Sequence, residues 1–225
     1  MTSALERQVG AVVGAPGYGK TVLTSQVIAG HRRVLILQPW THKNEYKAQR
    51  VTSYAALFGF LMRHGHGPFT VTYTPHPAEV PYIYMLVWAL QMDSLKRHGG
   101  TPDPILMVLE EATTYMVKAT KNADGTWIYR KGVTPDEFTH LTERGRHLQV
   151  SIILTTQRPF NLPLDLRATL DWVMAFHLPL KHDRAWFQDF APSVPGLGDE
   201  LLPLPKLRFR KVTQGGIVTN GEIQF

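Results

Sequence analysis

The stretch Gly14-Ala-Pro-Gly-Tyr-Gly-Lys-Thr21 matches the pattern G-x-x-x-x-G-K-[ST] at every fixed position. An apolar segment at residues 8–13 precedes it, and a helical pattern over residues 20–29 follows it. A strand before and a helix after are the context in which this pattern forms a phosphate-binding loop. The glycines let successive backbone N–H groups curl around a phosphate, and the helix N-terminus favours the same negative charge. The stretch therefore predicts a nucleotide-binding P-loop rather than a glycine-rich turn with a chance Lys-Thr pair.

The residues of this P-loop have distinct expected roles. Lys20 would reach the β- and γ-phosphates of a nucleoside triphosphate, and the Thr21 hydroxyl would ligate Mg²⁺. The remaining residues expected to bind the cofactor are Gly14, Pro16, Gly17, Tyr18 and Gly19. The sequence thus predicts ATP and Mg²⁺ as the cofactors of this site.

A second candidate element is the apolar run Ile105–Leu109, which leads directly into Glu110 and Glu111. It has the form of a Walker B segment, in which the first acid holds Mg²⁺ through its water shell and the second polarises the attacking water. We therefore expect Glu110 to serve the metal and Glu111 to activate water. Glutamate at position 110 is one methylene longer than the usual aspartate, and the alternative interpretation is a strand with a solvated acidic end.

A third apolar pattern, Val150–Thr156, leads into Gln157-Arg158-Pro159. An amide at the carboxyl edge of a sheet can hydrogen-bond both a γ-phosphate and the attacking water without bringing charge. Gln157 is therefore a candidate γ-phosphate sensor, although a strand followed by Gln-Arg-Pro is, on its own, more often a strand and its turn.

Strand and helix patterns alternate along the chain, which predicts an α/β fold with a mainly parallel sheet flanked by helices. Further strands are expected at residues 34–37, 69–73, 171–177, 206–211 and 216–225. Helices are expected at residues 78–97 and 138–147, a partly helical segment at 41–64, and a loop or small excursion at 118–136. A chain of 225 residues suits one such domain over residues 1–225.

The composition excludes several classes of protein. The chain has no cysteine, which rules out disulfides, thiolate metal sites and cysteine nucleophiles, and its ten histidines show no metal-ligand spacing. The net charge of +6 is compatible with nucleic acid as a partner. No run approaches the roughly 18–20 apolar residues of a spanning helix, and no signal peptide is visible, so we expect a soluble protein without membrane insertion.

The P-loop, the strand before Glu110 and Glu111, and the segment Glu143–His147 leading into Ile153–Pro159 together resemble the HerA–FtsK superfamily of DNA-pumping ATPases. The short length is similar to that of the genome-packaging ATPases of tailless, membrane-containing icosahedral viruses. The resemblance covers about residues 9–177. It implies a RecA-like core, a homo-oligomeric ring (hexamer or pentamer) and ATP-driven translocation of double-stranded DNA into a procapsid. It also implies capsid vertex or portal proteins as partners, and the host cytoplasm or the packaging vertex as the location.

The resemblance further implies an arginine finger that reaches the nucleotide of the neighbouring subunit. Arg144 and Arg146 precede the sensor strand, and Arg146 matches the Gly-Arg position of the family. A guanidinium group there would offset the charge that develops on the transferred phosphoryl group. Arg146 is the first candidate, Arg144 the second and Arg167 a weaker one. A solvated basic helix end is the alternative interpretation.

Two sets of basic residues are candidates for contact with DNA phosphates. As a strand, residues 206–211 would place Lys206, Arg208 and Arg210 on one face, although such a row could equally protect an edge strand against aggregation. The second set is Arg32, Arg33, Lys43, Lys47 and Arg50.

Two alternative functions are compatible with the motifs. The first is a cellular or plasmid DNA pump of the same superfamily, but those usually carry membrane segments or extra domains. The second is a P-loop small-molecule kinase, for which an arginine-rich lid would be expected. Glu111 and Gln157 suit the activation of water better than phosphoryl transfer to a small molecule.

Overall fold

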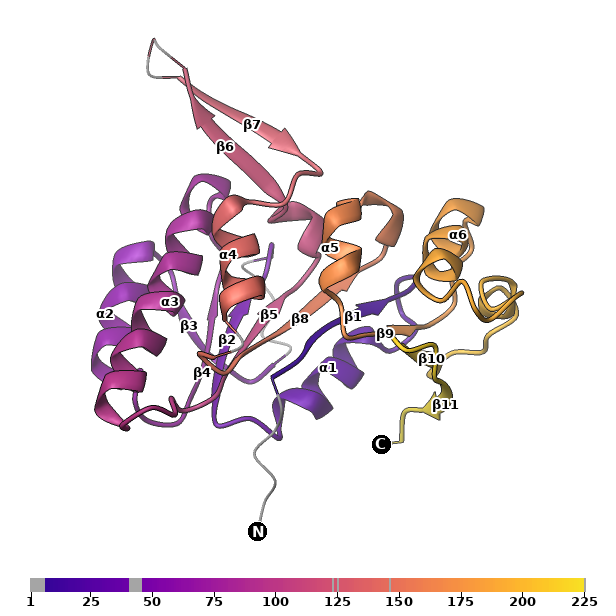
Figure 1. The fold of residues 1–225 in the computed structure, drawn as a ribbon, viewed down its shortest axis with the longest axis horizontal. Coiled ribbons are helices and arrows are strands. Elements are labelled where there is room, and N and C mark those ends of the chain that lie inside the picture. Colours follow the sequence, from indigo (N-terminus) through magenta and orange to yellow (C-terminus); the bar gives the residue numbers. More distant parts are fainter. Residues whose placement is uncertain (1–6, 41–45, 123, 125, 146, 225) are drawn as a thin grey trace.

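The computed structural model describes residues 7–40, 46–122, 124, 126–145 and 147–224. Its seven parallel strands are β1 (Val9–Val13), β2 (Arg33–Leu37), β3 (Gln49–Val51), β4 (Phe69–Tyr73), β5 (Ile105–Leu109), β8 (Val150–Thr156) and β9 (Trp172–Ala175). Two antiparallel strands, β10 (Arg208–Thr213) and β11 (Val218–Glu222), extend the sheet beside β9. Within the described ranges the order of this nine-stranded sheet is β11-β10-β9-β1-β8-β5-β2-β4-β3 (Figure 1).

Helices cover both faces of the sheet. The first face packs against α1 (Lys20–Ile28). The opposite face packs against α2 (Tyr54–His64), α3 (Val80–Arg97), α4 (Asp136–Arg144), α5 (Leu164–Thr169) and α6 (Lys181–Phe190). Side chains alternate along β2, so that Val34 and Ile36 belong to the core around α1, whereas Leu35 and Leu37 belong to the core around the other helices. Burial on both faces explains why the central strands are continuous apolar runs.

The expected α/β fold with a mainly parallel sheet and C-terminal strands is confirmed. The strands expected at residues 69–73, 105–109 and 150–156 have the expected bounds. The helix expected at residues 138–147 ends earlier, at Arg144, where Gly145 caps α4. A Cβ atom at Gly145 would lie 2.0 Å from the carbonyl oxygen of Leu141, so a residue with a side chain would not fit there without a shift of the backbone.

The sequence patterns missed several short elements. The segment 41–64 contains β3 as well as α2, and the segment 118–136 contains the hairpin of β6 (Val117–Lys121) and β7 (Trp127–Lys131). Neither α5 nor α6 was expected. α5 has six residues and β3 has three, which is too short for a periodic pattern to be recognised. The β6–β7 hairpin projects from the body of the molecule (Figure 1).

The parallel strands give the sheet two chemically different edges. The P-loop, Glu110, Glu111 and Gln157 follow strands, and therefore lie at the carboxyl edge. The amino edge carries the start of β2 and the C-terminal ends of α2, α3 and α4 (Figure 1). No helix in the described part of the chain is both long enough and apolar enough to cross a bilayer.

Candidate active site at the carboxyl edge

The P-loop joins β1 to α1 as a turn that is anchored at its base and open at its tip. Gly14, Gly17 and Gly19 have φ angles of 152°, 77° and 112°, which L side chains rarely adopt. The Gly14 N–H donates to the Thr156 carbonyl at 3.2 Å and fixes the base of the loop to the end of β8. At Gly17, a Cβ atom would meet no atom of the described chain within 4 Å. This open, glycine-lined turn has room for the phosphates that the sequence predicts.

Lys20 begins α1, and its side chain folds back over the loop. Its Nζ donates to the carbonyl oxygens of Gly14 at 2.7 Å and Ala15 at 3.2 Å. Burial lowers the pKa of Lys20, while the negative charges of Glu111 and Glu110 act in the opposite direction. The ammonium group therefore lies inside the loop and within electrostatic reach of both acids. These two carbonyl oxygens accept the hydrogen bonds of Nζ that phosphate oxygens would accept when a nucleotide binds. Thr21 follows Lys20 in the first turn of α1 and is half-buried.

Glu111 and Gln157, which the sequence singles out independently, are hydrogen-bonded to each other. Gln157 Nε2 donates to Glu111 Oε1 at 2.8 Å, and the Gln157 backbone N–H donates to Oε2 at 3.3 Å. Glu111 adopts the left-handed conformation (φ 50°, ψ 58°), which is uncommon for a residue with a side chain. Its N–H donates to Thr155 Oγ1 at 3.2 Å. This turn at the end of β5 brings the carboxylate to the end of β8.

Glu110 has different neighbours from Glu111. Its N–H donates to the Leu37 carbonyl at 2.8 Å, and the hydroxyl of Tyr46 donates to Glu110 Oε1 at 3.4 Å. The two adjacent acids therefore have different neighbours, and their different roles stay predictions. Tyr46 was not selected from the sequence, because it lies in a segment without a motif.

A buried carboxylate fixes the turn that follows Gln157. Asp183 lies on α6 and is only 1% exposed. Its Oδ2 accepts from Arg158 Nε at 3.0 Å and its Oδ1 accepts from the Phe160 N–H at 3.1 Å. Both carboxylate oxygens are thus bonded to the Gln157–Phe160 turn. Neither Asp183 nor α6 was predicted from the sequence. The signal that could have indicated Asp183 was an acidic residue within an amphipathic segment.

Tyr18 ties the P-loop to the C-terminal part of the chain. Its ring stacks on His177, with ring centroids 4.7 Å apart and an interplanar angle of 20°. Its carbonyl accepts from the Leu207 N–H at 3.1 Å. Because the ring is engaged in this way, the expected contact of Tyr18 with phosphates would come through its backbone N–H. Pro16 is exposed at the tip of the loop.

Of the candidate arginine fingers that the structure describes, Arg144 lies away from this site. Arg144 ends α4 at the amino edge, and the seven residues of β8 place it roughly 23 Å from the carboxyl edge at 3.3 Å per residue. Arg146 lies outside the described residues. Arg167 is paired with Asp189 at 3.1 Å, and its Cζ lies 5.3 Å from the centroid of the Trp186 ring. Arg144 is therefore too far from this P-loop to contact a nucleotide bound there.

The basic row expected in residues 206–211 does not form. Lys206 precedes β10, because Leu207 adopts a positive φ of 68° and interrupts the extended chain. Arg208 pairs with Glu222 of β11 at 3.6 Å. Arg210 lies 2.9 Å from Glu200. The two arginines of β10 therefore each lie beside an acid.

The described members of the second basic set are spread over the start of β2, the segment before β3 and β3 itself. Arg32 and Arg33 lie at the amino end of β2, where Arg33 pairs in register with Phe69 of β4. Arg50 pairs with Thr72, three residues or roughly 10 Å farther along β4. Lys43 lies outside the described residues.

Comparisons with known proteins support the fold of this site. No family model and no curated protein matches the sequence. Among solved structures, the genome packaging NTPase B204 from Sulfolobus turreted icosahedral virus 2, in complex with AMP, has a TM-score of 0.70 at 14% identity, covering 99% of this chain and 100% of that chain. Its complex with ATP-gammaS gives a TM-score of 0.67 at 14% identity, covering 97% and 98%.

A bacterial structure is also similar. VirB4 of Thermoanaerobacter pseudethanolicus has a TM-score of 0.60 at 10% identity, covering 96% of this chain and 89% of that chain. The chain therefore has the fold of a viral genome-packaging NTPase along its whole length, as the resemblance to the HerA–FtsK superfamily implied.

Proposed function

We propose that this chain is an ATPase that drives translocation of double-stranded DNA during the packaging of a viral genome into a procapsid, with residues 1–225 acting as one P-loop domain. The observation that carries the proposal is the 2.8 Å hydrogen bond between Gln157 and Glu111 beside the P-loop. It joins a carboxylate suited to water activation to an amide suited to sensing a phosphate. The whole-chain likeness to a packaging NTPase that was solved with ATP-gammaS supports the same function.

The residues at the carboxyl edge fit ATP and Mg²⁺. Lys20 would exchange its carbonyl partners for β- and γ-phosphate oxygens, and the open turn at Gly17 would hold the phosphates through its N–H groups. The Thr21 hydroxyl and, through water, the Glu110 carboxylate would hold the metal. Bound Mg²⁺ would supply positive charge that offsets the charge of the phosphates.

Glu111 would act as the base of the hydrolytic step. Its carboxylate would accept a proton from the attacking water while the bond between the γ-phosphorus and the bridging oxygen breaks. Gln157 holds this carboxylate with its side-chain N–H, which leaves its amide oxygen able to accept a hydrogen bond from the same water. Asp183 fixes the turn that presents Gln157 and so keeps the pair in place.

A ring of subunits would complete the site. Arg146, or secondly Arg144, would reach the nucleotide of the next subunit, and the place of Arg144 at the amino edge suits action between subunits rather than within one. On this proposal the chain forms a pentamer or hexamer around double-stranded DNA. It works in the host cytoplasm or at the packaging vertex, against capsid vertex or portal proteins.

The test is ATP hydrolysis measured with and without double-stranded DNA, together with ATP-dependent displacement of a third strand from a DNA triplex. We expect DNA to stimulate hydrolysis and the third strand to be displaced. ATP hydrolysis that is indifferent to DNA and leaves the triplex intact would contradict a DNA pump. Little hydrolysis in the absence of a small-molecule acceptor would instead indicate a kinase.

A further inference from the structure

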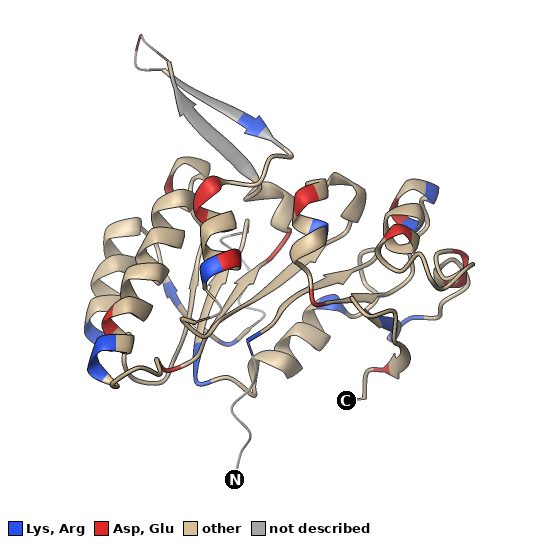
Figure 2. Ribbon diagram, in the orientation of Figure 1, with Lys and Arg blue, Asp and Glu red and all other residues tan. Residues whose placement is uncertain are grey.

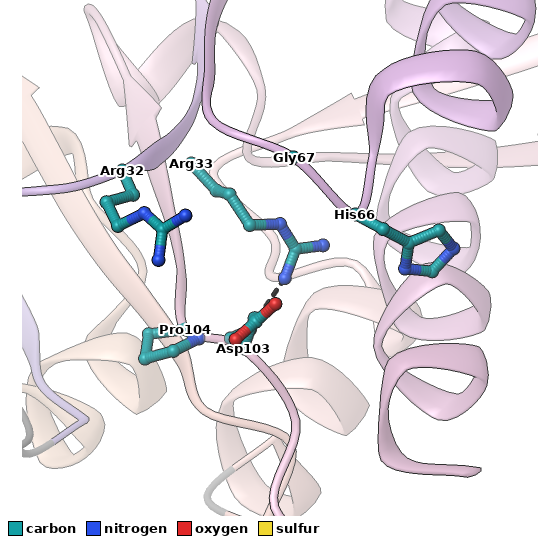
Figure 3. A pocket seen from close by; sticks show the side chains of 6 residues that line it. All are labelled: Arg32, Arg33, His66, Gly67, Asp103 and Pro104. Atoms are coloured by element: carbon teal, nitrogen blue, oxygen red, sulfur yellow. Dashed lines mark hydrogen bonds between the residues drawn. The ribbon is translucent and has the colours of Figure 1, made fainter. Parts of the chain in front are cut away.

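A small pocket at the amino edge of the sheet, opposite the candidate active site, is lined mainly by basic side chains. Its lining residues are Arg32, Arg33, His66, Gly67, Asp103 and Pro104 (Figure 3). They come from the start of β2, the turn after α2 and the segment before β5. The cavity measures about 50 Å³, whereas one water needs only about 10–15 Å³. The pocket therefore has space for a small polyatomic ion.

Arg33 is 3% exposed, yet part of its guanidinium group has no partner. Its Nη1 donates to the Asp103 carbonyl at 2.6 Å (Figure 3). Its Nε and Nη2 have no hydrogen-bond partner within the part of the chain that the structure describes. The group also lies over the Phe69 ring at 5.9 Å, a contact that satisfies neither N–H. Burial lowers the pKa of Arg33. Leaving charged donors buried and unpaired is costly, and an acceptor in the pocket would remove this cost.

The groups around Arg33 favour an anion. His66 Nδ1 is also buried without a partner among the described residues, while its Nε2 lies 3.0 Å from Asp93 Oδ2. An Nδ1 that carries a proton can donate a hydrogen bond to an acceptor in the pocket. Arg32 is exposed and adds a second guanidinium group. The opposing carboxylate of Asp103 has its own neighbour, His98 Nε2, at 3.6 Å. The positive charges of the two guanidinium groups thus exceed the single negative charge of the Asp103 carboxylate.

We propose that this pocket binds a phosphate group. The Nε–H and Nη2–H bonds of Arg33 lie along one edge of the planar guanidinium group, which is the edge that engages two oxygens of one phosphate. Arg32 and His66 Nδ1 would reach its remaining oxygens. A bound phosphate would thus accept hydrogen bonds from Nε and Nη2 of Arg33, which have no partner among the described residues.

Two sources could supply this phosphate: the backbone of DNA and free inorganic phosphate. The last turns of α2 and α3 add Arg63 and Lys96 to this end of the molecule, which favours DNA (Figure 2). The DNA source rests on the proposed function, whereas the phosphate pocket itself does not.

The test follows the ring resonances of ¹⁵N-labelled His66 in the full chain during titration with inorganic phosphate, in a Lys20→Ala background that disables the P-loop. We expect a saturable shift at His66. Arg33→Gln should weaken binding at least about tenfold, because it removes a charged bidentate donor. Lys96→Gln is the matched control, because it removes an exposed charge at the same end of the molecule without touching the pocket, and it should leave the shift unchanged.

Arg32→Gln keeps the proposal testable if Arg33→Gln fails to fold, because Arg32 is exposed. It should weaken phosphate binding several-fold and leave DNA-free ATP hydrolysis unchanged when Lys20 is intact. A second titration uses a short DNA duplex at low salt. The same His66 shift with the duplex, together with release of the duplex when phosphate is added, identifies the DNA backbone as the source. A shift with phosphate alone identifies free phosphate as the source. No His66 shift in either titration overturns the proposal, whatever the result of the ATP hydrolysis assay.

Discussion

The two edges of the sheet hold their polar side chains in different ways. At the carboxyl edge, Lys20 is bonded to the Gly14 carbonyl at 2.7 Å and Gln157 to Glu111 at 2.8 Å. At the amino edge, the buried Arg33 leaves Nε and Nη2 without a partner among the described residues. At the carboxyl edge, Lys20 and Gln157 must exchange a protein partner for a ligand atom when a ligand binds. At the amino edge, a ligand would bond to N–H groups of Arg33 that have no partner among the described residues. The carboxyl edge is therefore suited to a site that changes during turnover, and the amino edge to one that holds a ligand in place.

The largest effect is expected at the proposed contact between subunits. Arg146→Ala should fold and bind ATP but lose about 10³-fold or more in hydrolysis rate, because a finger stabilises charge only in the transition state. Mixing it with Glu111→Gln subunits should restore part of the activity, since some interfaces then pair an intact base with an intact finger. The measurement is steady-state ATP hydrolysis by mixed rings.

If mixed rings form and no activity returns, the finger does not act between subunits from position 146. The same mixing experiment with Arg144→Ala then decides whether the second candidate takes the role. Full activity in a strictly monomeric protein would remove the ring altogether.

The next-largest effect is expected at the P-loop, on the carboxyl edge. Lys20→Ala removes the ammonium group from the phosphate loop and should reduce ATP hydrolysis by about 10²–10³-fold, with weaker ATP binding. Lys96→Ala removes an exposed lysine at the opposite edge and serves as the matched control. Equal rates for Lys20→Ala and the wild type would show that the loop is not the phosphate site.

A smaller effect is expected at Asp183, which fixes the turn that presents Gln157. Asp183→Asn leaves Arg158 without its counter-ion, and because Arg158 is 49% exposed, water compensates for part of the loss. We expect about 1–3 kcal/mol less free energy of unfolding, measured by denaturant titration. Asp189→Asn is the control, since Asp189 is an exposed partner of Arg167 and should change stability by less than about 1 kcal/mol. Equal effects of the two substitutions would argue against a special role for the buried carboxylate.

The smallest effect tests the separation of the two acids. Tyr46→Phe removes the hydroxyl that contacts Glu110 at 3.4 Å and leaves Glu111 untouched. A hydrogen bond this long is weak, so we expect only a two- to fivefold increase, about 0.5–1 kcal/mol, in the Mg²⁺ concentration for half-maximal hydrolysis. A change in the maximal rate at saturating Mg²⁺ instead would place Tyr46 with the water-activating group.

The sequence predicted the residues of the carboxyl edge because each follows an apolar strand directly. Parallel strands bring their carboxyl ends to one edge, so Glu111 and Gln157 could be expected near each other before their hydrogen bond was seen. The roles assigned to Arg144 and Arg146 came from family resemblance alone, and they stay predictions.

The remaining contacts depend on segments that only the tertiary fold brings together. Arg158 meets Asp183 across 25 residues, Tyr46 meets Glu110 across 64 and Arg33 meets Asp103 across 70. No local pattern encodes these pairs. The row expected at residues 206–211 is interrupted by the positive φ of Leu207, which the sequence pattern did not indicate.

The central claim is that the carboxylate of Glu111, held by Gln157, activates water at the carboxyl edge. Its most direct test is Glu111→Gln, assayed for both ATP binding and single-turnover hydrolysis in the presence of double-stranded DNA. The substitution keeps the shape of the side chain and removes the base. We predict ATP binding close to that of the wild type and hydrolysis slowed by about 10²–10⁴-fold. Hydrolysis at the wild-type rate would contradict the account.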